Sequence, residues 1–499
     1  MAGPAMTYSM VDYGDVQGLV SFGYGRMTSA SYALVRVKNK SAAKAWLHSA
    51  PITSAVAQKP PPKTALNVAF TAPGLKALDV AEPLIAGFSR EFRKGMTTDY
   101  RRRLLGDLGH NVPERWYWGG PGREPHLLVM FFAEPEYFDS FVQSIKGDTW
   151  GDAFENEIWL GTSNLDGDEP FGFADGISQP QIDWDEQRQT PCTQLEYTNI
   201  VALGEFLLGY RNEYGKITDR PLLDPDAANA ELLPAVDTPE KKDLGRNGTY
   251  LVMRQLEQDV RGFWKFLYEQ ADGNLAEAAQ LGTKMVGRTR AGDPLVPIET
   301  EQIAGTDPRT AKQNQFTYEA DPDGTRCPFG AHVRRTNPRN SDFPERRPGV
   351  LRRFITILGF GRKGFYDDLI SSVRFHRILR RGREYGSELS PEEALEPVAD
   401  NSTRGLHFIC LNANISRQFE FLQSAWIAKT KFSGLTGESD PLLGNRESIT
   451  GCPVTGNFTI PGDGTLRRRV SGLPQFVTVR GGAYFFLPSL RALRYFAGA

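Results

Sequence analysis

A histidine followed closely by three arginines is the group of residues in this chain best suited to chemistry. His332 lies in the segment CPFGAHVRRTNPR, residues 327–339, and Arg334, Arg335 and Arg339 follow it. An imidazole can ligate the iron of a haem, and guanidinium groups can bind the two haem propionates. Because a lone histidine is more often a packed residue, the haem interpretation needs support from elsewhere in the chain.

A carboxylate in a turn of small residues is the second such feature. Asp175 lies in GFADGISQP, residues 172–180, where glycine allows the backbone to approach a flat ligand closely. Taken alone, Asp-Gly is typical of a tight turn. The segment RILRRGREYG, residues 377–386, adds several arginines. A ligand imidazole, an acid/base carboxylate and a cation together form the set that a peroxidase needs.

These three segments resemble, in order and in wording, those of the dye-decolourising peroxidases, a family of haem proteins. The length of the chain and the separation of its histidine and arginine segments look most like the larger, intracellular type. The resemblance implies one haem b per chain, reduction of hydrogen peroxide, and oxidation of phenolic and dye-like donors through a ferryl intermediate. Further segments that resemble the family are residues 18–25, 204–210, 248–264, 405–426 and 476–490.

The resemblance also implies roles for individual residues. Asp175 is expected to be the distal acid/base, Arg380 to stabilise peroxide cleavage and contact the haem, and His332 to be the axial ligand of the iron. On an alternating strand Arg380 and Arg381 point to opposite faces, so only one faces the haem, and motif position favours Arg380. His376, four residues earlier on the same predicted face, is the rival ligand or a distal neighbour.

A carboxylate is expected to accept a hydrogen bond from the second ring nitrogen of His332. By resemblance this is Asp440, in SDPLLG, and Glu420 is the alternative, with a structural ion pair as its competing role. Further contacts with the haem are implied for Gly176, Ile177, Asn337, Pro338 and Arg339.

Bulky dyes cannot reach a buried haem, so oxidising equivalents are expected to leave through an aromatic side chain. Trp426 is the predicted surface radical site, and Tyr366 and Tyr385 are weaker alternatives. The chain contains 8 Trp and 17 Tyr, so packing is at least as common a role for any one of them.

Composition excludes several classes of function. With 40% hydrophobic and 24% charged residues the chain is typical of a soluble globular protein. Its 58 basic and 60 acidic residues give a net charge of −2, so neither nucleic acid nor an anionic membrane is an expected partner, and a homo-oligomer is left open. The first 25 residues contain no lysine or arginine, which favours a cytoplasmic protein, although secretion of a processed form stays open.

The four cysteines are scattered and contain no C-x-x-C pair. Neither a zinc site nor a disulfide scaffold is therefore expected. Cys327 is the least favoured candidate for an iron ligand, because a buried cysteine is commonly a small apolar filler. The cysteines are Cys192, Cys327, Cys410 and Cys452.

The elements that position these residues follow an α+β pattern. The resemblance implies two ferredoxin-like units whose antiparallel sheets pack together, the dimeric α+β barrel type. We expect an N-terminal unit at 1–215 with the Asp175 loop, inserted loops and helices at 216–312, and a C-terminal unit with the haem ligand at 313–499. Strands are predicted at residues 31–39, 64–72, 125–135, 373–382, 405–414 and 476–488, and helices at 41–50, 134–147, 414–429 and 489–498.

The competing function, from a different class, is a haem carrier or storage protein without turnover. A carrier needs the ligand histidine but neither a distal acid/base nor a distal cation. The joint presence of Asp175 and Arg380 therefore favours the enzyme.

Overall fold

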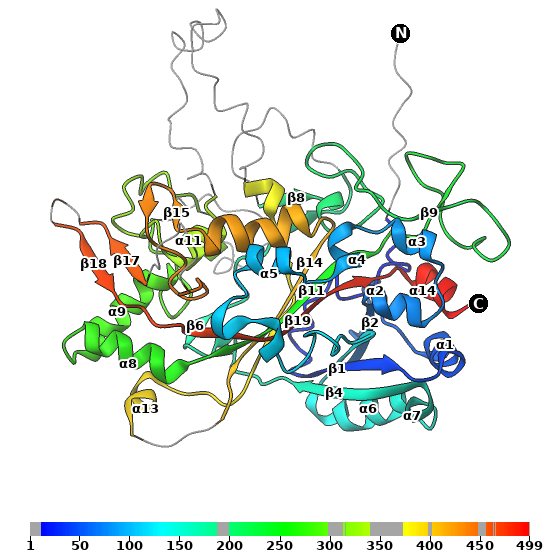
Figure 1. Cartoon of the computed structure of the whole chain (residues 1–499), viewed down its shortest axis with the longest axis horizontal. Coiled ribbons are helices and arrows are strands. Elements are labelled where there is room, and N and C mark those ends of the chain that lie inside the picture. The colour runs from blue at the N-terminus through cyan, green and yellow to red at the C-terminus, as the bar shows by residue number, and fades with distance from the viewer. Residues whose placement is uncertain are drawn as a thin grey trace, which may run out of the picture.

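In the part of the chain that the structure describes, a nine-stranded antiparallel sheet organises the protein (Figure 1). The strand order is β12-β14-β11-β19-β2-β3-β1-β4, and β13 also pairs with β14. The computed structural model describes residues 11–186, 199–297, 313–314, 316–339, 373–397, 402–447, 456–462, 464 and 466–498.

The N-terminal half of the sheet forms because its strands are rich in apolar residues. β3 reads LLVMFFA and is buried along its whole length, as expected for a central strand covered on both faces. It lies between β1 and β2, and β1 also pairs with β4. These strands are β1 (Ser29–Val37), β2 (Thr64–Phe70), β3 (Leu127–Ala133) and β4 (Phe154–Gly161).

The C-terminal half is centred on β11, which pairs with β14 on one side and with β19 on the other. The short strands β12 and β13 both pair with β14. A single residue pair, Phe486 with Phe70, joins β19 to β2 and thereby connects the two halves. The strands of this half are β11 (Thr249–Gln258), β12 (Leu379–Arg380), β13 (Arg383–Tyr385), β14 (Gly405–Asn412) and β19 (Val477–Leu487).

Helices flank both halves, and Figure 1 shows α8 and α9 at the opposite side of the molecule from α1 and α6. The side chains of Asn39, Asp259, Asn274 and Ser489 accept backbone hydrogen bonds at the first turns of α1, α8, α9 and α14, which stabilises these helix starts. The helices are α1 (Lys40–Ser49), α6 (Phe138–Lys146), α8 (Val260–Gln270), α9 (Leu275–Val286) and α14 (Leu490–Ala497).

Alternate residues of β11 fill two apolar clusters, one on each face of the sheet. Tyr250 and Val252 belong to one cluster, and Leu251 and Met253 belong to the other. Because side-chain direction alternates along a strand, the even-numbered residues that follow Val252 continue on its face. The cavity described below lies on that face.

The predicted α+β class with antiparallel sheets is confirmed, but one predicted strand is wrong. Residues 373–382 are not one strand: a 3₁₀ turn covers Val373–His376, and only Leu379 and Arg380 form β12. The reason is that β12 reaches the edge of β14 through these two residues alone.

The predicted helix at 414–429 is π-helical, over Ser416–Glu420 and Leu422–Ala428. Such segments are rare and are frequent at functional sites. The division of the chain at residues 215 and 312 stays a prediction. No helix in the described ranges is both long and apolar enough to cross a bilayer.

Candidate active site

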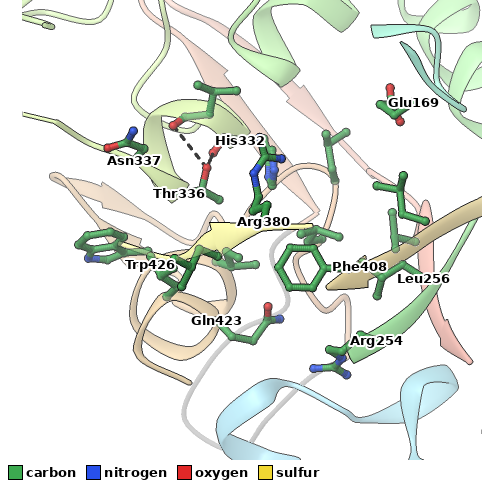
Figure 2. A pocket seen from close by; sticks show the side chains of 18 of the residues that line it. Glu169, Arg254, Leu256, His332, Thr336, Asn337, Arg380, Phe408, Gln423 and Trp426 are labelled. Atoms are coloured by element: carbon green, nitrogen blue, oxygen red, sulfur yellow. Dashed lines mark hydrogen bonds between the residues drawn. The ribbon is translucent and has the colours of Figure 1, made fainter. Parts of the chain in front are cut away.

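A cavity of about 270 Å³ lies against one face of the C-terminal half of the sheet. Its sheet wall is made by alternate residues of three neighbouring strands, which share a face because the side-chain period is two. Figure 2 shows Leu256 and Phe408 from this wall. The wall residues are Arg254, Leu256 and Gln258 of β11, Leu406 and Phe408 of β14, and Val477 and Val479 of β19.

His332 begins the short helix α11 (His332–Thr336) and lines the cavity. Its Nδ1 lies 2.9 Å from Oδ2 of Asp440, whose side chain is completely buried. Burial acts to lower the pKa of His332, but the charge and hydrogen bond of Asp440 outweigh it, so the pKa is raised. The pairing fixes the ring, and Nε2 is the nitrogen left to ligate an iron.

Asp440 is held by its own neighbours. Its Oδ1 accepts hydrogen bonds from the backbone N–H groups of Leu442 and Leu443, both at 2.9 Å. Burial acts to raise the pKa of Asp440, but His332 and the nearby charge of Arg335 lower it below its usual value. The structure therefore brings together the two residues that the sequence predicted as partners.

Arg380 and Asp175 meet in the same cavity. The Arg380 Nη1 donates to Asp175 Oδ1 at 2.8 Å, and the Arg380 backbone N–H donates to Gln179 Oε1 at 3.1 Å. Figure 2 shows Arg380 and His332 directed to the same part of the cavity. The two segments that the sequence singled out separately are thus one cluster.

Asp175 stays ionised for an identifiable reason. Burial acts to raise the pKa of its carboxyl, but the charge of Arg380 and the backbone N–H of Gly176 lower the pKa below its usual value. Gly176 has a φ of 77°, in the left-handed region that favours glycine, and this lets the turn aim its N–H at the carboxylate. A carboxylate in this state is a base.

Arg381 points away from the cavity, in agreement with the predicted alternation. Its Nε and Nη2 donate to the backbone oxygens of Leu19 and Val20, at 2.7 and 2.8 Å. His376 is not on a strand, yet it does line the cavity, with its ring stacked on Phe421 at 3.7 Å.

The arginines that follow His332 have structural partners, which corrects the expectation that they bind propionates. Arg334 pairs with Asp321 at 2.9 Å, and Arg335 donates to the backbone oxygens of Trp426, Lys429 and Glu438. Arg339 donates to the backbone oxygens of Asn314 and Phe316. The expectation failed because only one side of the short helix α11 faces the cavity, and Arg334 and Arg335 lie on its other side.

Of the other expected haem contacts, some line the cavity and some do not. Ile177 and Asn337 line the cavity, whereas Gly176, Pro338 and Arg339 are not among the described residues that line it.

Glu420 is not the carboxylate beside His332. It accepts from Arg101 Nε at 2.7 Å and from the Tyr484 hydroxyl at 2.9 Å, and these contacts make it the structural ion pair that was its alternative role.

The surface position predicted for Trp426 is wrong. Its side chain belongs to the cavity wall and the residue is only 6% exposed, because the π-helical segment turns it inward, beside His376. Tyr385 is also buried, at 8% exposure, and Tyr366 lies outside the described residues.

Among the polar residues of the cavity that the sequence did not indicate, Arg288 and Glu169 bear most on its chemistry. Arg288 donates to the backbone oxygens of Gly292 and Gln313 and to the Ser178 hydroxyl, and none of its partners in the described ranges is a carboxylate. Glu169 precedes the Asp175 turn. No feature of the sequence around Arg288 indicates a site residue. The short separation of Glu169 from Asp175, by contrast, could have predicted that the two carboxyls lie close together.

Comparisons with known proteins bear on the class of this chain. No protein-family model matches the chain. The dye-decolorizing peroxidase AauDyP1 of Auricularia auricula-judae is 28% identical over 508 residues, which cover 96% of this chain and 86% of that protein. The multifunctional dye peroxidase DyP2 of Amycolatopsis is 30% identical over 363 residues, or 68% of this chain and 63% of that protein.

The same family is found among solved structures. The crystal structure of a decolorizing peroxidase from Auricularia auricula-judae superposes with a TM-score of 0.72 at 26% identity, covering 98% of this chain and 100% of that one. Fold and site therefore define an α+β protein of the haem peroxidase class. The chain belongs to the dye-decolorizing peroxidases.

The residues present fit a haem. The cavity offers an oriented imidazole, an acid/base carboxylate with a cation beside it, and apolar walls for a macrocycle. Arg288 is a buried cation whose partners in the described ranges are neutral, so an anionic propionate would complete its surroundings.

Asp440 is predicted to stabilise the fold as well as to orient His332. Asp440→Ala removes the acceptor for two backbone N–H groups and the carboxylate near Arg335, so we expect a loss of about 3–5 kcal/mol in the free energy of unfolding. Asp440→Asn keeps an oxygen that can accept from the two N–H groups. Its free energy of unfolding should therefore fall by only about 1–3 kcal/mol. Denaturant unfolding measures both, and two variants as stable as the parent would contradict the assignment.

Proposed function

We propose that this chain is a haem b peroxidase in which Asp175 is the distal acid/base, Arg380 stabilises peroxide cleavage and His332 is the axial ligand. It reduces hydrogen peroxide and oxidises phenolic and dye-like aromatic donors. The observation that carries the proposal is that the Asp175–Arg380 pair and the His332–Asp440 pair share one cavity.

Each residue has a task that its surroundings support. Haem, when bound, supplies the iron at which the O–O bond is cleaved and the store of oxidising equivalents. Asp175, kept ionised by Arg380, accepts the proton of the inner peroxide oxygen and returns it to the outer oxygen, which leaves as water. The Arg380 guanidinium stabilises the negative charge that develops on the departing oxygen.

In the same cavity, Asp440 holds His332 by its Nδ1–H and gives the ring partial imidazolate character. Ile177, Asn337 and Arg288 line the space beside these groups. A haem carrier without turnover would need the histidine but no ion pair of this kind. The subtype, the cytoplasmic location and the oligomeric state stay predictions from the sequence.

The ligand assignment predicts that His332→Ala loses most of its haem. The variant His110→Ala, which changes an exposed histidine outside the cavity, is the matched control and should keep its haem. Haem content and the Soret band measure the outcome. A His332→Ala protein with full haem and an unchanged Soret band would move the ligand role to His376.

Arg288 is predicted to anchor a propionate. Arg288→Leu removes a charge-assisted hydrogen bond, which is worth about 1.5–3 kcal/mol, and should weaken haem binding roughly tenfold to a hundredfold in a titration of the haem-free protein. Arg290→Leu, two residues away and exposed, is the control. Equal affinities for the two variants, at equal stability of the haem-free proteins, would rule the anchor out.

The acid/base assignment predicts that Asp175→Asn and Arg380→Leu bind haem but react with peroxide roughly 10²–10⁴-fold more slowly, because each removes part of the cleavage machinery. Arg381→Leu, which changes the neighbouring arginine on the other face, should keep the peroxide rate. Stopped-flow spectroscopy gives the rates. Near-parental rates in both Asp175→Asn and Arg380→Leu, with haem retained, would contradict this mechanism.

A further inference from the structure

Glu169 is a second carboxyl in the cavity, and the proposed cleavage step does not use it. The two-residue strand β5 (Asp168–Glu169) pairs with β6 (Phe173–Ala174), and Asp175 follows β6 directly. The Asp175 backbone N–H closes this hairpin by donating to Gly167 at 2.9 Å. One small hairpin therefore presents both carboxyls to one cavity, and Figure 2 shows Glu169 at its margin.

The surroundings of the two carboxyls differ. Asp175 has the guanidinium of Arg380. Glu169 has no ion pair among the described residues: it accepts from Gln258 Nε2 at 2.6 Å and from the backbone N–H groups of Phe171 and Phe173 at 3.1 and 3.2 Å. Burial raises the pKa of Glu169 to about 7, and the negative charge of Asp175 adds to the rise.

The other charged groups near this hairpin are accounted for. Asp168 is exposed, and the charge of Arg290 acts on it to lower its pKa, whereas burial raises that pKa overall. On β11, Arg254 is paired with Asp107. Asp175 is thus the charge that acts on Glu169, and it favours the neutral form.

Pairs of carboxyls whose surroundings drive their pKa values apart commonly divide the acid and base roles. Reduction of one hydrogen peroxide to two waters takes up two protons and two electrons. The aromatic donors supply the electrons, so protons must reach the cavity in each turnover. Asp175 is ionised and cannot store one.

We propose that Glu169 is the proton store of this cavity, which passes its proton to Asp175 through water that enters the cavity. The O–H bond of Glu169 breaks, an O–H bond forms on the Asp175 carboxylate, and Asp175 passes the proton to the oxygen being reduced. Glu169 then regains a proton from solvent. The inference rests on the proposed peroxidase function, and Glu169 acts through Asp175 and is a positioning residue.

Infrared spectroscopy of the haem-loaded protein tests the store without turnover. Between pH 6 and pH 8 we expect the band of one protonated carboxyl to disappear as the pH rises through about 7, because a group with a raised pKa is neutral below that pH. The band should be absent from Glu169→Gln and present in Asp168→Asn, the adjacent exposed carboxyl. No such band in the parent, or its persistence in Glu169→Gln, would overturn the proposal.

The pH profile of turnover tests the role. In the parent, kcat for a small phenolic donor should fall as the pH rises through about 7; Glu169→Gln should lose this inflection and show a kcat at least tenfold lower at pH 6, with haem content retained. Asp168→Asn should match the parent. If Glu169 only holds the hairpin, Glu169→Gln lowers stability but keeps the inflection, which sinks the proposal. Failure of the peroxidase function itself would show instead as a haem-loaded parent that does not turn over hydrogen peroxide and the phenolic donor.

Discussion

The ion pair between Asp175 and Arg380 is the contact on which the site depends. It joins residues 205 positions apart, and the backbone N–H of Arg380 is tied to the same loop through Gln179. β12 is only two residues long, so its position at the edge of β14 depends on these contacts as well as on its two ladder partners. Without the pair, the carboxylate would lose the neighbouring positive charge that lowers its pKa.

The cavity shows how burial and one cation can give two carboxyls opposite states. Both Asp175 and Glu169 are raised in pKa by burial, and only Asp175 has an arginine to reverse the effect. The two carboxyls belong to one hairpin, so their pKa values differ because only Asp175 has a charged partner. Nearby positive charge likewise lowers the pKa of Asp440, beside His332. The chemistry is thus set by a few pairings within an apolar enclosure.

Local sequence was enough to find much of this. GFADG and AHVRR indicated the proposed acid/base carboxylate and the proposed ligand histidine, SDPLLG indicated the carboxylate beside that histidine, and strand alternation separated Arg380 from Arg381. The first three rest on the resemblance of these segments to a known family, and the last rests on the two-residue period of a strand. The strands β3, β14 and β19 were equally readable, because long apolar stretches leave few alternatives for their burial.

The sequence by itself determined which chemical groups are present and the class of the fold. Only the tertiary structure decided which groups face the cavity. The three arginines that follow the histidine in sequence, Arg334, Arg335 and Arg339, are buried, and they donate hydrogen bonds to Asp321 and to backbone oxygens. Arg288, from a distant segment, lines the cavity instead. Trp426 turned inward for a similar reason: a large apolar ring is more stable in a packed wall than in water. Partner choice among buried polar groups depends on contacts between remote segments, and no local pattern encodes it.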